Sequence, residues 1–120
     1  MESITRPQLL FILDSDPRQS ARPAEAIRVA AGVAAWKKVD ITVYLRGPAL
    51  LALGEWLDEL RDEDNYTRYL PLLAEGKQPI YVQANAPELA EIGTPTCAVV
   101  PISDSELAKL AAKSTSILRF

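Results

Sequence analysis

Runs of apolar residues mark five candidate strands along the chain. Residues 9–13, Leu-Leu-Phe-Ile-Leu, contain no polar position, which is typical of a central strand covered by helices on both faces. Residues 40–45 alternate between polar and apolar side chains and are rich in β-branched residues. Shorter segments that read as strands lie at residues 79–83, 96–100 and 116–120. We therefore predict five strands separated by helical or irregular segments.

Helical periodicity occupies most of the intervals between these strands. Pro23 suits a first helical position, and small apolar residues then recur at helical spacing as far as Ala34. Residues 62–76 are helical in part, but Pro71 would break or restart a helix, so we expect a broken one. A helical turn is predicted over residues 87–92. A stripe of leucines predicts a further helix after the second strand: Leu50, Leu53, Leu57 and Leu60.

Residues 103–106, Ser-Asp-Ser-Glu, are the clearest local signal in the chain. They fit a capping box, in which the Ser103 hydroxyl accepts the N–H of Glu106 while the Glu106 carboxylate accepts the N–H of Ser103. A helix is therefore predicted to begin here and to bury Leu107 and Leu110. It leads into the last strand.

The alternation of strands and helices predicts an α/β fold. Right-handed crossovers between the strands would give a three-layer α/β/α sandwich with a five-stranded, mostly parallel sheet. The length of 120 residues, 48% of them hydrophobic and 24% charged, suits a single globular domain over residues 1–120.

Polar residues follow several of the predicted strands. Because ligands of open parallel sheets bind at the carboxyl ends of the strands, we take these residues as ligand-binding candidates: Asp14, Ser15, Asp16, Arg46, Gln83, Asn85 and Ser103. Arg18, Arg22 and Arg46 would converge on a small anion if the loop after the first strand folds over the sheet edge. In the alternative interpretation, the aspartates are turn and cap residues and the arginines are solvated loop charges.

Charge and residue usage exclude several classes of function. Thirteen basic and sixteen acidic residues leave a net charge of -3, so no basic field favours binding to nucleic acid. The chain has no histidine, which excludes Ser-His-Asp and Cys-His nucleophile systems and removes the commonest transition-metal ligand. Its five glycines form no phosphate-binding loop and no dinucleotide fingerprint. We expect no cofactor, no metal site and no catalytic residues, and an enzymatic role is the less favoured one.

The apolar run at residues 9–13 is too short for a signal peptide or a membrane span. We therefore expect a soluble, cytoplasmic protein without membrane contact, in agreement with its single cysteine, Cys97. A reactive thiol needs an exposed position near positive charge. Cys97 is near the beginning of a predicted strand, away from the candidate residues, and we expect it to be a small buried hydrophobe.

Taken in order, several segments resemble the DsrE/DsrF-like family, small α/β proteins that include sulfur-relay subunits. The resemblance rests on the order and spacing of residues 9–13, 24–35, 41–49, 80–82 and 105–120. It implies a homo-oligomer, either a trimer or a hexamer. It also implies a position for a persulfide-accepting cysteine, just after the third strand.

That position is occupied here by Gln83-Ala84-Asn85, which offers no thiol. The resemblance therefore favours a divergent, non-catalytic binding or accessory module. Two alternatives stay open: a sulfur carrier that uses Cys97, and a flavodoxin-like small-ligand binder or enzyme with its site at the carboxyl ends of the strands.

A surplus of apolar side chains over residues 50–73 predicts self-association independently of the resemblance. These side chains occupy more than one helical face, whereas one face suffices to cover a sheet, and soluble monomers rarely expose large apolar patches. Trp56, Tyr66 and Tyr69 add aromatic surface of the kind enriched at interfaces. We expect further copies of the chain to be the main partners, with a protein partner or a small anion as the others.

Overall fold

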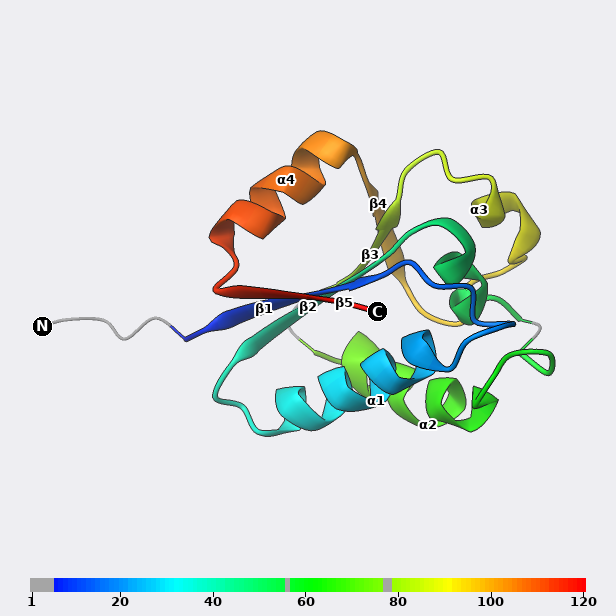
Figure 1. Ribbon diagram of the computed structural model, residues 1–120, viewed down its shortest axis with the longest axis horizontal. Helices are drawn as coiled ribbons and strands as arrows, with labels where there is room; N and C mark the ends of the chain where they lie inside the picture. The colour runs from blue at the N-terminus through cyan, green and yellow to red at the C-terminus, as the bar shows by residue number, and fades with distance from the viewer. Residues whose placement is uncertain (1–5, 56, 77–78) are drawn as a thin grey trace, which may run out of the picture.

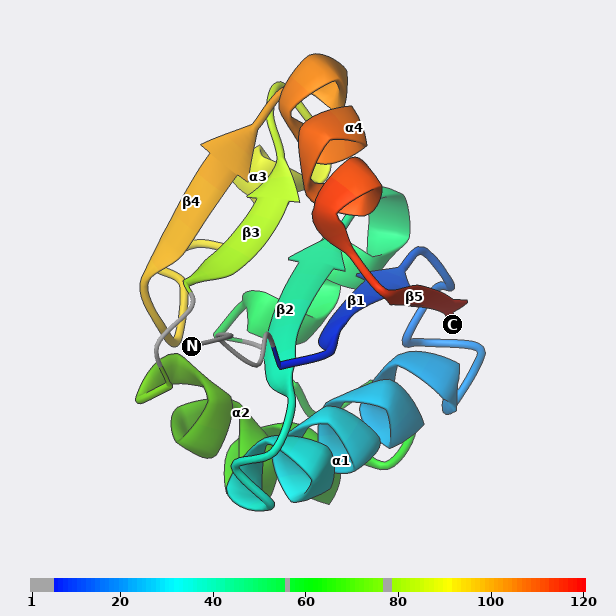
Figure 2. The same ribbon diagram turned by 90° about the vertical axis from the view of Figure 1, so that its left-hand side faces the viewer.

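A computed structural model describes residues 6–55, 57–76 and 79–120 of the chain. Its centre is one five-stranded sheet in the order β4-β3-β2-β1-β5, and each neighbouring pair of strands is parallel (Figures 1 and 2). The predicted α/β class is confirmed. The strands are β1 (Gln8–Leu13), β2 (Asp40–Leu45), β3 (Ile80–Gln83), β4 (Val99–Ile102) and β5 (Ser116–Arg119).

Helices cover both faces of this sheet, as the predicted three-layer sandwich requires. α1 (Arg22–Ala35) and α2 (Glu63–Ala74) lie on one face, and α4 (Asp104–Lys113) lies on the other (Figure 2). Two shorter elements, the 3₁₀ helix η1 (Gly47–Leu53) and α3 (Glu88–Glu91), lie toward the carboxyl ends of the strands (Figure 1).

β1 contributes side chains to two separate apolar clusters. Phe11 and Leu13 point into the larger cluster, which lies between the sheet and α1, α2 and η1. Leu10 and Ile12 point into the smaller one, beneath Leu107, Leu110 and Ala111 of α4. Because alternate side chains of a strand enter opposite layers, the sequence of β1 has to be apolar throughout.

The leucine helix predicted over residues 50–60 is wrong. The helical segment is η1, and the chain leaves it at Gly54, whose N–H donates to the carbonyl of Leu51 at 3.2 Å. The next residue donates its N–H to the carbonyl of Ile92 at 3.3 Å. A Cβ at position 54 would lie 3.1 Å from both the Cβ and the carbonyl oxygen of Ile92, so this close passage favours glycine. Leucine periodicity gives no sign of that contact.

The broken helix predicted over residues 62–76 is also wrong, since α2 runs without interruption through Pro71. Pro71 is exposed and lies in the last turns of the helix, where the loss of one backbone hydrogen bond affects few residues. Asn65 does not cap the helix; its side-chain amide donates to the carbonyl of Ala24 at 3.3 Å and so joins α2 to α1.

The fourth strand begins and ends later in the chain than the predicted residues 96–100. β4 spans Val99–Ile102 and includes Pro101. The carbonyl of Ile102 accepts the N–H of Ala84 at 3.0 Å, so the backbone groups of Ile102 face β3. Backbone groups alternate in direction along a strand, which turns the nitrogen of Pro101 outward. At a sheet edge that nitrogen needs no hydrogen.

Most of the apolar surplus over residues 50–73 is absorbed within the chain. Leu72 is the one large hydrophobic side chain exposed in the described part of this range, at 56%. Trp56 lies outside the described residues, and Trp36, at the end of α1, is 66% exposed. The buried members are Leu50, Leu53, Leu60, Tyr66, Leu70 and Leu73. The apolar surface left for self-association on this segment is therefore smaller than the sequence predicted.

No helix within the described ranges is both long and apolar enough to cross a bilayer.

Two glycines give a paired test of this fold. A Cβ at Gly32, in α1, meets no atom within 4 Å, so Gly32→Ala should raise the free energy of unfolding by about 0.5–1 kcal/mol through the better helix propensity of alanine. Gly54→Ala should lower it by about 1–3 kcal/mol, because its Cβ would press on the backbone of Ile92. Urea unfolding midpoints measure both. Shifts of the same sign would contradict the passage described at Gly54.

Candidate functional site at the carboxyl ends of the strands

Asp14, the residue after β1, binds arginines from both neighbouring strands. Its Oδ2 accepts a hydrogen bond from Arg119 of β5 at 2.6 Å and a longer one from Arg46, which follows β2, at 3.4 Å. The strand order explains this convergence, since β1 lies between β2 and β5. The Arg119 hydrogen bond, assisted by Arg46, lowers the pKa of Asp14 below its ordinary value of 3.8 although burial opposes the shift.

Backbone contacts fix the end of β5 against the loop after β1. The carbonyl of Phe120 accepts the N–H groups of Asp14 at 3.0 Å and Ser15 at 3.3 Å, and its own N–H donates to the carbonyl of Ile12 at 2.9 Å. The Phe120 ring stacks on Phe11 with 5.7 Å between centroids. Ser15 thus joins the candidate site through its backbone.

The two aspartates of this loop do not act together. Asp16 binds Arg18, accepting its backbone N–H at 2.9 Å and two guanidinium bonds at 2.9 and 3.1 Å. This local pair holds the pKa of Asp16 below its ordinary value. The arginines that converge therefore differ from those expected. Arg18 binds Asp16 and does not join Arg46 at Asp14.

Arg22 contacts a member of this cluster but not Asp14. The Arg22 guanidinium donates to the backbone carbonyl of Arg119 at 3.1 Å. Sequence reasoning missed Arg119. The signal that would have found it is the pairing of the last strand with the first, which places Arg119 level with Ile12, two residues before Asp14.

Gln83 and Asn85 shape the turns at the carboxyl ends of the strands. The Gln83 side-chain oxygen accepts the N–H of Gly47 at 2.9 Å and so ties β3 to the start of η1. Gly47 has φ of 56°, a left-handed conformation that suits glycine. Asn85 has φ of 64°, which asparagine tolerates better than most residues, and lies exposed in the turn after β3.

Ser103 caps α4 as the sequence predicts. Its Oγ accepts the N–H of Glu106 at 3.2 Å, and Glu106 Oε1 accepts the N–H of Ser103 at 3.0 Å. These bonds lower the pKa of the Glu106 carboxyl. The hydroxyl proposed as a ligand contact is thus used in the cap.

Tyr44, beneath α4, is fully buried, and its hydroxyl has no hydrogen-bond partner among the described residues. Tyr66, buried on the opposite face of the sheet, has the same property. In both cases burial raises the pKa of the phenol.

Cys97 precedes β4, whereas Asp14 and Arg46 follow the last residues of β1 and β2, and Gln83 is the last residue of β3. It is half-buried and packs against the larger apolar cluster. Burial raises the pKa of its thiol.

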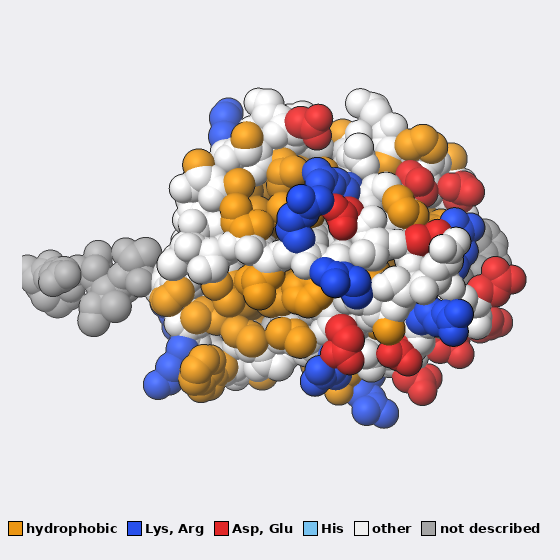
Figure 3. Space-filling model, in the orientation of Figure 1, with side chains coloured by type: hydrophobic (Ala, Val, Ile, Leu, Met, Phe, Trp, Pro, Cys, Tyr) orange, Lys and Arg blue, Asp and Glu red, His pale blue; other side chains and the backbone are white. Residues whose placement is uncertain are grey.

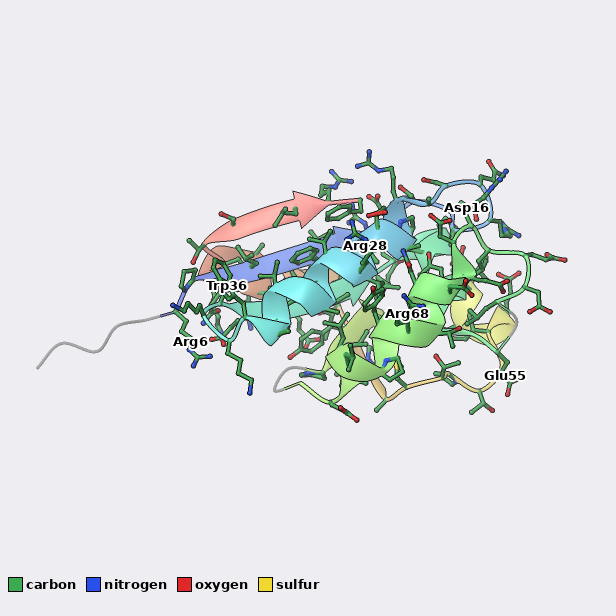
Figure 4. All side chains as sticks on the ribbon, turned by 90° about the horizontal axis from the view of Figure 1, so that it is seen from below. Arg6, Asp16, Arg28, Trp36, Glu55 and Arg68 are labelled. Carbon is green, nitrogen blue, oxygen red and sulfur yellow. The ribbon has the colours of Figure 1, made fainter. Side chains whose placement is uncertain are left out.

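Two hollows lie on the surface of the described residues, and neither is lined by any of the seven candidate residues. The larger, of about 310 Å³, lies near the start of β2, between Arg6, Lys37 and Leu72. Figure 4 shows Arg6 and Trp36 at this end of the molecule and Asp16 at the opposite end. The smaller, of about 220 Å³, lies beside α4 near Tyr81. Among the residues that the structure describes, no three His, Cys, Asp or Glu side chains gather as metal ligands would.

Comparison with known proteins shows the fold. No protein-family model matches the chain. No curated protein matches it in sequence. Among solved structures, the crystal structure of the ychN protein from E. coli aligns with a TM-score of 0.77 and 18% identity, over 95% of this chain and 99% of that one. This shared architecture supports the DsrE-like fold that the order of segments suggested.

The Asp14 cluster predicts an acid-sensitive contribution to stability. Asp14→Asn should lower the free energy of unfolding by about 1 kcal/mol at pH 7, the scale of a partly exposed ion pair. The folded-state pKa lies below the unfolded value, so this contribution is present above the unfolded pKa and is lost as the pH falls through the folded one. Urea unfolding at pH 7, 5 and 3 measures the difference.

The matched control is Asp64→Asn, which removes an exposed carboxylate from α2. A deficit of Asp14→Asn that persists unchanged at pH 3 would contradict the assignment of the stabilisation to the Asp14 carboxylate.

Proposed function

We propose that the protein is a divergent DsrE-like protein that works as a non-catalytic, oligomeric binding or accessory module. The observation that carries the proposal is the stretch at the end of β3. The resemblance assigns a persulfide-accepting thiol to that stretch, and the chain has Gln83-Ala84-Asn85 there.

The contacts of these residues are structural. Gln83 accepts the N–H of Gly47, and Ala84 donates its N–H to the carbonyl of Ile102, both within 3.0 Å. The stretch therefore links the end of β3 to the start of η1 and to the last residue of β4. A side-chain amide and a methyl group hold the place where a sulfur carrier needs a nucleophile.

Cys97 is a poor substitute for the missing thiol. A sulfur carrier reacts as the thiolate, and burial disfavours that form of Cys97. The residue lies before β4, half-covered by the larger apolar cluster. These features support a packing role for Cys97.

The proposal predicts that the native protein retains no sulfane sulfur after treatment with a persulfide donor, as measured by intact mass. For the same reason, Cys97 should react with iodoacetamide at pH 7 at least ten-fold more slowly than an exposed cysteine.

Ala84→Cys is the matched control, because it places a thiol in the stretch to which the resemblance assigns one. We expect this variant to be alkylated faster than the native chain. Stoichiometric, stable sulfur on Cys97 in the native protein would reject the non-catalytic module in favour of a sulfur carrier.

A second candidate function is favoured by the arginine cluster. Arg46 and Arg119 bind the single carboxylate of Asp14, and Arg22 contacts the backbone of Arg119, which leaves local positive charge in a chain of net charge -3. Arginine side chains recognise oxyanions through paired hydrogen bonds. This supports binding of a small anion at the carboxyl ends of the strands.

Calorimetric titration with inorganic phosphate and sulfate tests this candidate. Binding should weaken at least five-fold in Arg46→Gln, which removes a guanidinium from the cluster, and should be unchanged in Arg18→Gln, whose arginine pairs with Asp16. Equal effects of the two substitutions would reject a site at Asp14.

A further inference from the structure

The two edges of the sheet differ in their capacity to accept another strand. On β4, the outward-facing residues are Val99 and Pro101, and Pro101 has no N–H to donate. Proline at such a position is one of the devices by which proteins prevent pairing at a sheet edge. The other edge, β5, contains no proline.

The alternation of hydrogen bonds on β5 identifies its free groups. Phe120 bonds to Ile12 and Asp14, on the side of β1, so Leu118 and Ser116 also turn their backbone groups toward β1. Ile117 and Arg119 turn theirs away from the sheet. Arg22 already occupies the carbonyl of Arg119. The outward groups left are the N–H and C=O of Ile117 and the N–H of Arg119.

Apolar surface adjoins this edge on both sides. Ile117 is 46% exposed on the face that α4 partly covers, and Leu118 and Phe120 are half-buried on the α1 side. Figure 3 shows hydrophobic side chains gathered in a band along β5 and toward both flanking helices. Figure 2 shows β5 at the open side of the sheet.

β5 is also fixed against β1 at both of its ends within the single chain. At its start, the Thr115 N–H donates to the carbonyl of Gln8 at 2.7 Å, and the Gln8 N–H donates to Thr115 Oγ1 at 2.9 Å. At its end, Phe120 stacks on Phe11. Pairing at this edge therefore requires little additional ordering of the chain, a cost that otherwise weakens association.

We propose that β5 pairs with β5 of a second copy, antiparallel, about a two-fold axis at Ile117. Each Ile117 N–H then donates to the carbonyl of the partner's Ile117, which uses the outward groups of this residue without disturbing the Arg22 contact. The exposed Ile117 side chains meet across the axis. The inference rests on the proposed function only for the expectation of an oligomer.

A second copy fits this edge better than repeated addition of strands. The two Arg119 side chains lie on opposite sides of the axis, roughly 13 Å apart along the strands, so their charges do not meet. The β4 edge, blocked by Pro101, stops the sheet from extending further, and a two-fold pair is closed. Strands of four residues bury little area, so we expect dissociation in roughly the micromolar range.

Sedimentation equilibrium of the full chain from 1 to about 300 µM tests the pairing, with an expected approach to twice the 13.2 kDa of one chain. Ile117→Pro removes an outward N–H and leaves the bonds to β1 in place, as Pro101 does on β4, and should raise the dissociation constant at least ten-fold. Ile117→Lys keeps the N–H, places like charges at the axis and should act in the same direction. Circular dichroism verifies that both variants fold.

The matched control is Val100→Lys, which changes an exposed side chain on the other edge strand and should leave the dissociation constant unchanged. A second readout uses Ile117→Cys in a Cys97→Ala background. Pairing at the axis places the two new thiols within disulfide range, so mild oxidation should give a covalent dimer.

Each of the following results would overturn the inference: a monomer at every concentration, an odd-numbered assembly, or a dimer that both Ile117 variants leave intact. If Leu72→Glu dissociates the assembly instead, α2 is the interface and the β5 inference fails while the oligomeric module stands. Persulfide labelling of Cys97 has the converse effect, because it rejects the non-catalytic module and leaves the pairing of β5 untouched.

Discussion

β1 is paired with a parallel strand on each side and covered by side chains on both faces, and this enclosure determines where polar chemistry can begin. From Leu10 to Leu13 every side chain is buried. The first position free to carry charge is Asp14. β2 ends level with Leu13 and β5 ends level with Ile12, so Arg46, which follows β2, and Arg119 of β5 converge on this carboxylate. The polar cluster is a consequence of the central strand's burial.

Sequence reasoning succeeded where a single segment decides its own structure. The apolar run of β1, the alternating residues of β2 and the capping box at Ser103 each contain their cause locally, and the structure confirms all three. Sequence reasoning failed where a contact between distant parts of the chain determines the structure. η1 ends because Gly54 passes against Ile92, and Arg119 joins Asp14 because β5 pairs with β1. Neither contact leaves a mark in the periodicity of its own segment.

The candidate site shows the same division. Most of the seven residues chosen from the sequence do lie at one edge of the sheet, but several of them stabilise the edge itself: Gln83 holds Gly47, Ser103 caps α4, and Asp16 binds Arg18. Position after a strand predicts proximity. It does not predict whether a side chain is occupied by its own neighbours, which depends on the conformation of the loops. A shared fold likewise leaves the chemistry of the edge to be determined by the residues present there.

The unpaired phenols of Tyr44 and Tyr66 have an optical consequence. One lies beneath α4 and the other beneath the opposite pair of helices, so each samples a different layer of the sandwich. Because burial keeps both neutral past the ordinary phenol pKa of 10, ionisation should follow the opening of the layer above each ring. Ultraviolet absorbance of phenolate during alkaline unfolding would therefore report the opening of both layers, and substitution of either tyrosine by phenylalanine would assign each signal to its face.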